Sequence, residues 1–317
     1  MPTPLSLLTP PPRRKRRFVR EAPSPFQLTA RDIELVHHVA RHRFLRSTHL
    51  SELVVAPHKK VCDRLTGLFH AGFLDRPRAQ LERYREGGGS APMVYALGPE
   101  GARLLIEHFG SDVADVDWRR KNELAGRQFI LHTLAIADVR VALTRAVRKR
   151  PGFAILEPAD LLALAPPEAC RPERPWIWRV PVRYGDATHD LGVAPDHVFA
   201  VRYPDGPFRA YLVECDRGTM PVDRPGLAQT SLKRKVLAYT ALKRVGLLQR
   251  QLGWKAFRVL VVTNTRQRAD NLLATITETV HEQGRGLFLV ADRAALEPSD
   301  IFDFAWRDAT GATHSLV

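Results

Sequence analysis

Two acidic residues that follow a hydrophobic run near the middle of the chain are the side chains best placed to do chemistry. In YLVECDRGT, residues 211–219, the apolar start predicts a buried β-strand, and Glu214 and Asp216 come directly after it. Residues two apart on a strand point to the same face, so these carboxylates are expected to be neighbours. Asp196 lies on the other side of a predicted hairpin whose turn is YPDGP, residues 203–207. Antiparallel pairing of the two strands would bring Asp196 close to both acids.

Three carboxylates that converge beside apolar residues repel one another unless a positive charge lies among them. Oxygen-rich clusters suit Mg²⁺, so we expect Mg²⁺ as a cofactor, with Asp196, Glu214 and Asp216 as its ligands. A metal ion at such a site lowers the pKa of a bound water and stabilises the charge that develops during phosphodiester cleavage. A second interpretation stays open, in which Glu214 and Asp216 only pair with Arg217 or Lys235, or cap the next helix.

This arrangement of acids resembles the PD-(D/E)xK nuclease superfamily. Pro195 and Asp196 match the PD of the motif, and Glu214-x-Asp216 matches its second part. The resemblance implies a restriction-endonuclease-like mixed-sheet α/β domain and Mg²⁺-dependent cleavage of DNA. Active members usually have Lys where this chain has Asp216, so the domain is expected either to cut DNA or only to bind it.

A lysine on the next helix can take the role of the missing lysine in that superfamily. A basic helix is predicted from about Ala228 to Leu252, and it contains Lys233 and Lys235. We prefer Lys235, because it stands four residues before Tyr239 on one helical face. The predicted catalytic residues are therefore Asp196, Glu214, Asp216 and Lys235. His132, on an earlier long helix, is interpreted as a core histidine rather than as part of this site.

A second set of candidate residues is basic and lies within residues 26–110. Three helical patterns between residues 30 and 71 are followed by two strand-like segments, which is the order of a winged helix-turn-helix. Such a fold places its third helix in the major groove of double-stranded DNA. The predicted DNA-binding residues are His58, Lys59, Lys60 and Arg64 on the third helix and Arg83 and Arg85 beside the hairpin tip.

The charge distribution favours a polyanionic partner. The net charge is +14, and the first 100 residues have 17 Lys and Arg against 9 Asp and Glu, compared with 31 against 25 in the remainder. The excess is therefore densest near the N-terminus, where residues 1–25 are expected to form a disordered basic arm that contacts phosphates. An ordinary solvated basic surface is the alternative interpretation.

The patterns divide the chain into the arm (1–25), a winged helix domain (26–110) and a nuclease-like domain (118–310). In the last of these, the order helix, strand, strand, strand, helix, strand, helix, strand predicts a mixed α/β sheet with helices on both faces. The three cysteines form no CxxC pair, and no apolar run approaches the length of a membrane span. We therefore expect a cytoplasmic protein that does not contact membranes.

The pattern as a whole is similar to the replication-relaxation family of plasmids and other mobile elements. Its most specific parts are ECDRGT with Lys235 and Tyr239, and the long helix that carries His132 and Asp138. The resemblance implies a DNA-binding protein that assists replication or relaxation, with replication or conjugation proteins as partners. The alternative is a non-enzymatic winged-helix transcriptional regulator or an accessory scaffold.

Overall fold

A computed structural model describes the chain except for residues 1–16, 22–25, 81–90, 111–116, 167–173 and 225. The chain divides into two compact units, residues 1–130 and 131–317. In the described part, none of the helices combines the length and the hydropathy that a membrane span needs.

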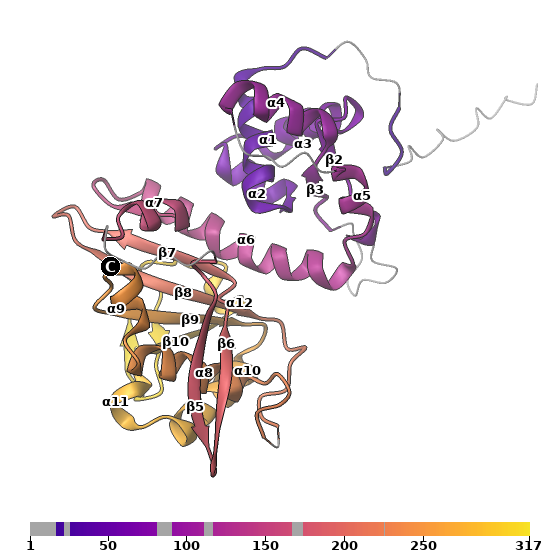
Figure 1. Ribbon diagram of the computed structural model, residues 1–317. Coiled ribbons are helices and arrows are strands. Elements are labelled where there is room, and N and C mark those ends of the chain that lie inside the picture. The colour runs from indigo at the N-terminus through magenta and orange to yellow at the C-terminus, as the bar shows by residue number, and fades with distance from the viewer. Residues whose placement is uncertain (1–16, 22–25, 81–90, 111–116, 167–173, 225) are drawn as a thin grey trace, which may run out of the picture. The chain divides into compact units, whose positions relative to one another are not determined.

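The N-terminal unit consists of helices and a small antiparallel sheet (Figure 1). Its elements are α1 (Ala30–His42), β1 (Leu45–Arg46), α2 (Ser47–Leu53), α3 (His58–His70), β2 (Leu74–Asp75), the 3₁₀ helix η1 (Arg78–Gln80), β3 (Val94–Leu97), α4 (Pro99–Phe109) and α5 (Trp118–Glu123). The strand order is β1-β3-β2, and both neighbouring pairs are antiparallel. The predicted order of three helices followed by two strands is found, with a much shorter first strand of the hairpin and an additional strand, β1, before α2.

A buried carboxylate ties α1 to α3. Asp32 has no exposed surface, although it closes a capping box with Thr29 at the start of α1. Arg64 of α3 donates a hydrogen bond from Nε to Asp32 at 2.9 Å, and its guanidinium lies over the ring of Phe26. Burial alone would raise the pKa of Asp32, but the hydrogen bonds from Arg64 and Thr29 hold that pKa below its ordinary value.

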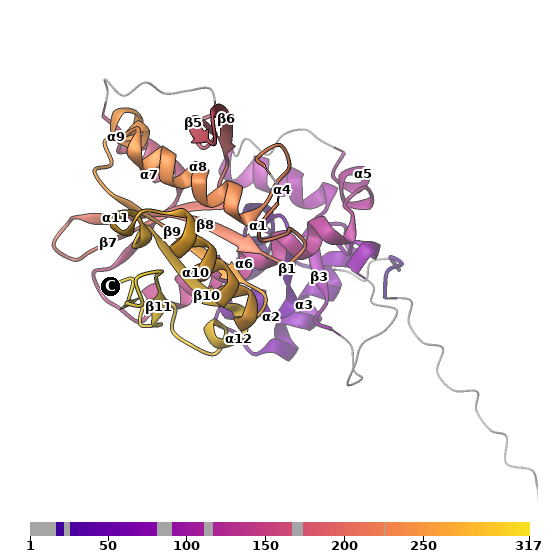
Figure 2. The same cartoon turned by 90° about the horizontal axis from the view of Figure 1, so that it is seen from below.

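The C-terminal unit is a mixed sheet with helices on both faces (Figures 1 and 2). Its elements are α6 (Arg127–Arg148, which enters this unit at residue 131), β4 (Ala154–Leu156), α7 (Pro158–Ala163), β5 (Trp178–Tyr184), β6 (Ala187–Val193), β7 (His197–Arg202), β8 (Phe208–Asp216), α8 (Leu232–Arg244), α9 (Leu247–Leu252), β9 (Phe257–Thr263), α10 (Arg266–Thr279), α11 (Glu282–Arg285), β10 (Phe288–Asp292), α12 (Arg293–Leu296), β11 (Trp306–Arg307) and β12 (Thr313–His314). The predicted order of helices and strands is present in it, and the mixed α/β class is confirmed.

The described sheet has the strand order β12-β11-β10-β9-β8-β7-β4. Strands β8, β9 and β10 are parallel, and the other neighbouring pairs are antiparallel. Among the strands of the described residues, β5 and β6 pair only with each other and form a separate hairpin. The central position of β8 explains its apolar sequence, because a strand with neighbours on both sides and helices on both faces is buried throughout.

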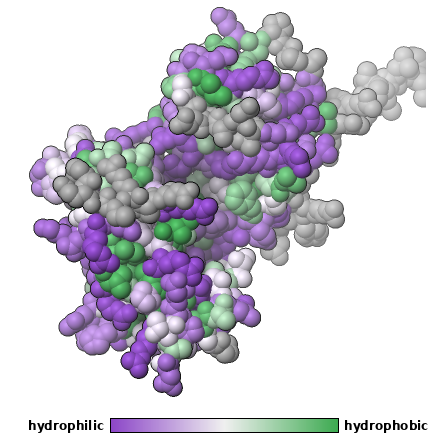
Figure 3. Space-filling view, viewed as in Figure 1, coloured by the Kyte–Doolittle hydropathy of each residue, from purple (hydrophilic) through white to green (hydrophobic). Residues whose placement is uncertain are grey.

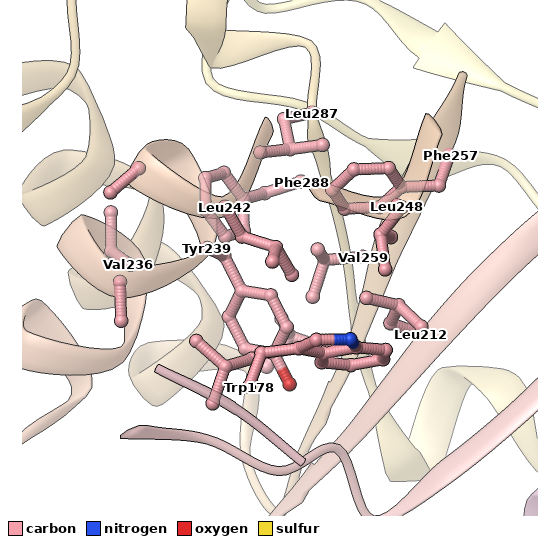
Figure 4. Packing of buried hydrophobic residues seen from close by; sticks show 14 of the residues in the cluster. Trp178, Leu212, Val236, Tyr239, Leu242, Leu248, Phe257, Val259, Leu287 and Phe288 are labelled. Carbon is pink, nitrogen blue, oxygen red and sulfur yellow. The ribbon is translucent and has the colours of Figure 1, made fainter. Parts of the chain in front are cut away.

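Alternate residues of β8 belong to two separate cores. Leu212 packs with α8, α10 and the β5–β6 hairpin, and Figure 4 shows it close to Trp178 and Tyr239. Tyr211 and Val213 point to the opposite face, where α6 packs. This alternation follows from the two-residue period of a strand. Outside these cores, the face shown in Figure 3 is mostly hydrophilic, with hydrophobic side chains gathered in small patches.

The basic helix predicted from Ala228 to Leu252 is shorter and broken. Helix α8 begins at Leu232 and ends at Arg244, and α9 starts only at Leu247. Gly246, between the two helices, has a φ of +62°, a backbone conformation that glycine adopts without strain. The break therefore falls at the residue that tolerates it best.

The Asp32–Arg64 pair predicts a pH-dependent loss of stability. Asp32→Asn should lower the free energy of unfolding at pH 7 by about 1–3 kcal/mol, because the amide accepts weaker hydrogen bonds from Arg64 and Thr29. A carboxyl whose pKa is depressed on folding stabilises the protein above its unfolded pKa and loses this effect as the pH falls through its folded pKa. Urea denaturation of both proteins from pH 7 downward should therefore show a difference that shrinks below about pH 4. A constant difference across that range would contradict the prediction.

Candidate functional site

The end of β8 is the place where polar side chains from several elements meet. Residues Ala210 to Cys215 of the strand are buried, and Glu214 is among them. The predicted pairing with the preceding strand is present, since His197 of β7 stands opposite Val213. The backbone N–H of Asp196 donates to the carbonyl of Val213 at 2.9 Å, which holds Asp196 at the same end of the sheet.

Glu214 is a buried carboxylate with two partners on α8. Its side chain is 7% exposed, Lys235 Nζ donates to Oε2 at 2.5 Å, and the hydroxyl of Tyr239 donates to Oε1 at 2.5 Å. Burial raises the pKa of Glu214, Lys235 opposes this rise, and the charge of Asp196 adds to it. The pKa of Lys235 is raised by Glu214 against the effect of burial, so the lysine stays charged. The four-residue spacing places Lys235 and Tyr239 on one face of α8, and both side chains reach Glu214.

Asp196 is held from two sides. Its Oδ2 accepts the backbone N–H of Cys215 at 2.7 Å, and its Oδ1 lies 3.0 Å from Nε2 of His132 on α6. The histidine side chain is 33% exposed, so it is not the enclosed core residue that the sequence suggested. Asp196 is close enough to Glu214 for its charge to raise the pKa of that residue. Two of the three predicted acids thus lie near each other.

Asp216 has a different environment from the other two acids. Both of its oxygens accept hydrogen bonds from the guanidinium of Arg268 on α10, the Nη2 bond to Oδ1 measuring 3.0 Å. The same guanidinium donates to the carbonyl of Met220, and the N–H of Gly218 donates to Oδ1 at 3.3 Å. Arg268 therefore fastens the loop after β8 to the strand end. Asp216 is therefore an acid whose charge is compensated by Arg268 of α10.

A hollow of about 90 Å³ opens at this strand end. Its walls come from α6, the end of β8, the following loop and α8, namely His132, Glu214, Cys215, Asp216, Arg217, Thr219, Met220, Leu232 and Lys235. Cys215 is buried with a pKa raised by desolvation, so its thiol is neutral and no nucleophile.

The acids of this site have partners within the chain. Among the residues that the structure describes, no three His, Cys, Asp or Glu side chains form a group that could hold a metal. Both oxygens of Glu214 and both oxygens of Asp196 already have partners, and Asp216 is paired with Arg268. Lys235 therefore compensates Glu214, and Arg268 compensates Asp216.

The predicted DNA-binding residues differ in their exposure and in the contacts that they make within the chain. His58, Lys59 and Lys60 are exposed at the start of α3, with His58 Nε2 lying 3.1 Å from the hydroxyl of Ser47. Arg64 is bound to Asp32, and its side chain is 37% exposed. The two arginines predicted beside the hairpin tip, Arg83 and Arg85, lie outside the described residues.

Sequence reasoning missed two members of the site. His132 was separated from Asp196 by 64 residues, and its single position on a helix gave no metal or catalytic spacing. Arg268 lies 52 residues beyond Asp216 and has no motif around it. One signal was available for Arg268, because a buried-strand acid such as Asp216 needs a cation from somewhere in the fold.

The Glu214–Lys235 pair predicts a large stability effect. Lys235→Met should lower the free energy of unfolding by about 3 kcal/mol or more, because it leaves a buried carboxylate without its cation. Adding Glu214→Gln to that variant should recover part of the loss. Lys233→Met is the matched control: Lys233 pairs with the exposed Asp223, and its loss should cost less than about 1 kcal/mol. Urea denaturation measures all three, and equal effects of the two single substitutions would rule out the role given to Glu214.

Comparison with known proteins places the chain in a family. Residues 36–256 match the replication-relaxation family, a region that begins within α1 and includes the other helices and strands described in the N-terminal unit, the end of β8 and α8. No curated protein and no solved structure matches the chain significantly. Since the family match covers more than half of the sequence, the protein belongs to the replication-relaxation family.

Proposed function

We propose that the protein binds double-stranded DNA and serves the replication or relaxation of a plasmid or another mobile element. The observation that carries this proposal is the pair of exposed lysines, Lys59 and Lys60, at the start of α3. Neither lysine has an acidic partner among the described residues. The net charge of +14 and the family membership support the same conclusion.

The order of elements in the N-terminal unit supports a winged helix-turn-helix. Helices α2 and α3 are separated by the four residues 54–57, and the antiparallel strands β2 and β3 follow α3. In proteins of this class the helix after the turn enters the major groove with its N-terminal end toward the DNA. Lys59 and Lys60 stand at that end of α3.

One observation favours a second candidate function, metal-dependent cleavage of DNA. Lys235 contacts Glu214 beside the hollow, and Asp196 lies close by, which are the residue types that phosphodiester hydrolysis uses. Cleavage of that type needs a divalent ion, whereas the carboxylate oxygens of these acids already accept hydrogen bonds from groups of the protein. The geometry therefore supports a C-terminal unit that docks DNA or a replication protein without cutting.

DNA binding is tested by removing the two lysines and leaving Arg64 intact, because Arg64 is needed by Asp32. In Lys59→Ala/Lys60→Ala, affinity for a labelled duplex should fall, and the slope of log K against log salt should flatten by about two. The matched control is Lys243→Ala/Lys255→Ala, which removes the same charge from two exposed positions of the other unit. Fluorescence anisotropy at several salt concentrations measures both. If the two double variants bind equally, α3 is not the contact.

Cleavage is tested on supercoiled plasmid with Mg²⁺ or Mn²⁺. We expect neither the wild-type protein nor Glu214→Gln to nick the plasmid, and we expect both to retain the same affinity for DNA. Agarose electrophoresis detects nicking, and circular dichroism verifies that the variant is folded. The opposite result is nicking by the wild type that is lost in Glu214→Gln and kept in Lys233→Met. That result would favour metal-dependent cleavage over the docking role.

A further inference from the structure

The turn between α2 and α3 contains a valine in a conformation that valine rarely adopts. Val55 has a φ of +49°, and among the described residues other than glycine only Arg43 shares a positive φ. A β-branched residue is strained in this region of φ. Turns between two such helices often contain glycine, which meets the same requirement without strain. A turn between two helices accounts for the positive φ at position 55, but it does not account for the presence of valine there.

Packing within the chain does not explain why the residue is valine either. Val55 is 76% exposed, whereas the two residues before it, Leu53 and Val54, are buried. A side chain so exposed gains little from the removal of apolar surface from water. Val55 therefore makes the free protein less stable than glycine would. A compensating gain must come from something that is not part of the folded chain.

The neighbours of Val55 identify the chemistry of that partner. Pro57, His58, Lys59 and Lys60 follow it on the chain and are all exposed. The exposed acid nearby in sequence, Glu52, is already engaged in an interaction of its own. An apolar group beside lysines fits duplex DNA, where phosphates attract the lysines and the thymine methyl or the deoxyribose offers an apolar surface.

We propose that Val55 is an apolar DNA contact of the turn, packing on a thymine methyl or a deoxyribose while Lys59 and Lys60 bind phosphates. This inference rests on the DNA-binding function proposed above and adds a residue that reads the groove. The strained turn persists because the complex buries a side chain that the free protein leaves in water.

Two substitutions separate the strain from the contact. Val55→Gly removes both, whereas Val55→Ala removes most of the apolar contact and keeps a side chain at positive φ. Both should weaken binding to a duplex selected by the wild-type protein from a random pool by roughly tenfold, with an unchanged salt slope. Val55→Gly alone should raise the melting temperature. Val55→Ile should retain affinity, and Ile106→Ala, at an exposed apolar position on α4, should bind as the wild type does.

The outcomes distinguish this inference from the function on which it rests. If the wild type binds no duplex in the random pool, the proposed DNA-binding function fails and the role of Val55 fails with it. If the wild type binds and Val55→Gly binds equally well, only the role of Val55 is overturned. Loss of binding in Val55→Gly but not in Val55→Ala would also overturn it, because the turn's rigidity would then be the cause. Loss in both, with retention in Val55→Ile, establishes the contact.

Discussion

A carboxylate that cannot reach water is the constraint on which the C-terminal unit is built. Glu214 lies at the buried end of the central strand β8, where an unpaired charge would cost several kcal/mol. Lys235 and Tyr239 offset that cost from successive turns of α8. The two hydrogen bonds fix how α8 is rotated and how far it lies along β8. The same face of the helix then brings Val236 and Leu242 into the core that Leu212 shares.

The neighbouring acids extend this constraint to the other helices. Asp196 is met by His132 of α6 on one face of the sheet, and Asp216 by Arg268 of α10 on the other. Three helices that are far apart in sequence are thus attached to one strand end by polar contacts. Apolar packing alone is tolerant of small shifts between helix and sheet, whereas hydrogen-bonded charges in a poorly solvated place are not. The strand end is therefore the most precisely specified part of this unit.

The features predicted correctly from the sequence are those that a local pattern determines. The contacts that were missed join residues that lie far apart in the sequence. The apolar run before Glu214 indicated a buried strand, and the Asp205–Gly206 turn indicated the hairpin, because both signals lie within a few residues. The four-residue spacing of Lys235 and Tyr239 is equally local. Arg268 reaches Asp216 only because β9 lies parallel to β8 and α10 follows it, and that depends on strand order rather than on any residue near Asp216. The break at Gly246 was not predicted, because a glycine inside a helical pattern does not always end the helix.

The charges of the two units differ in what they can contribute to binding a polyanion. Lys235 and Arg268 are positive, but each is paired with a buried or half-buried acid, and a phosphate would have to displace that acid at the full cost of leaving it unpaired. In the part of the chain that the structure describes, Lys59 and Lys60 have no acidic partner. They could therefore bind phosphates and release counterions from a nucleic acid without that cost. By this reasoning, the DNA binding proposed here would depend mainly on α3 and its turn. The paired acids at the end of β8 determine the shape of the unit that carries the hollow, and they add little to the attraction itself.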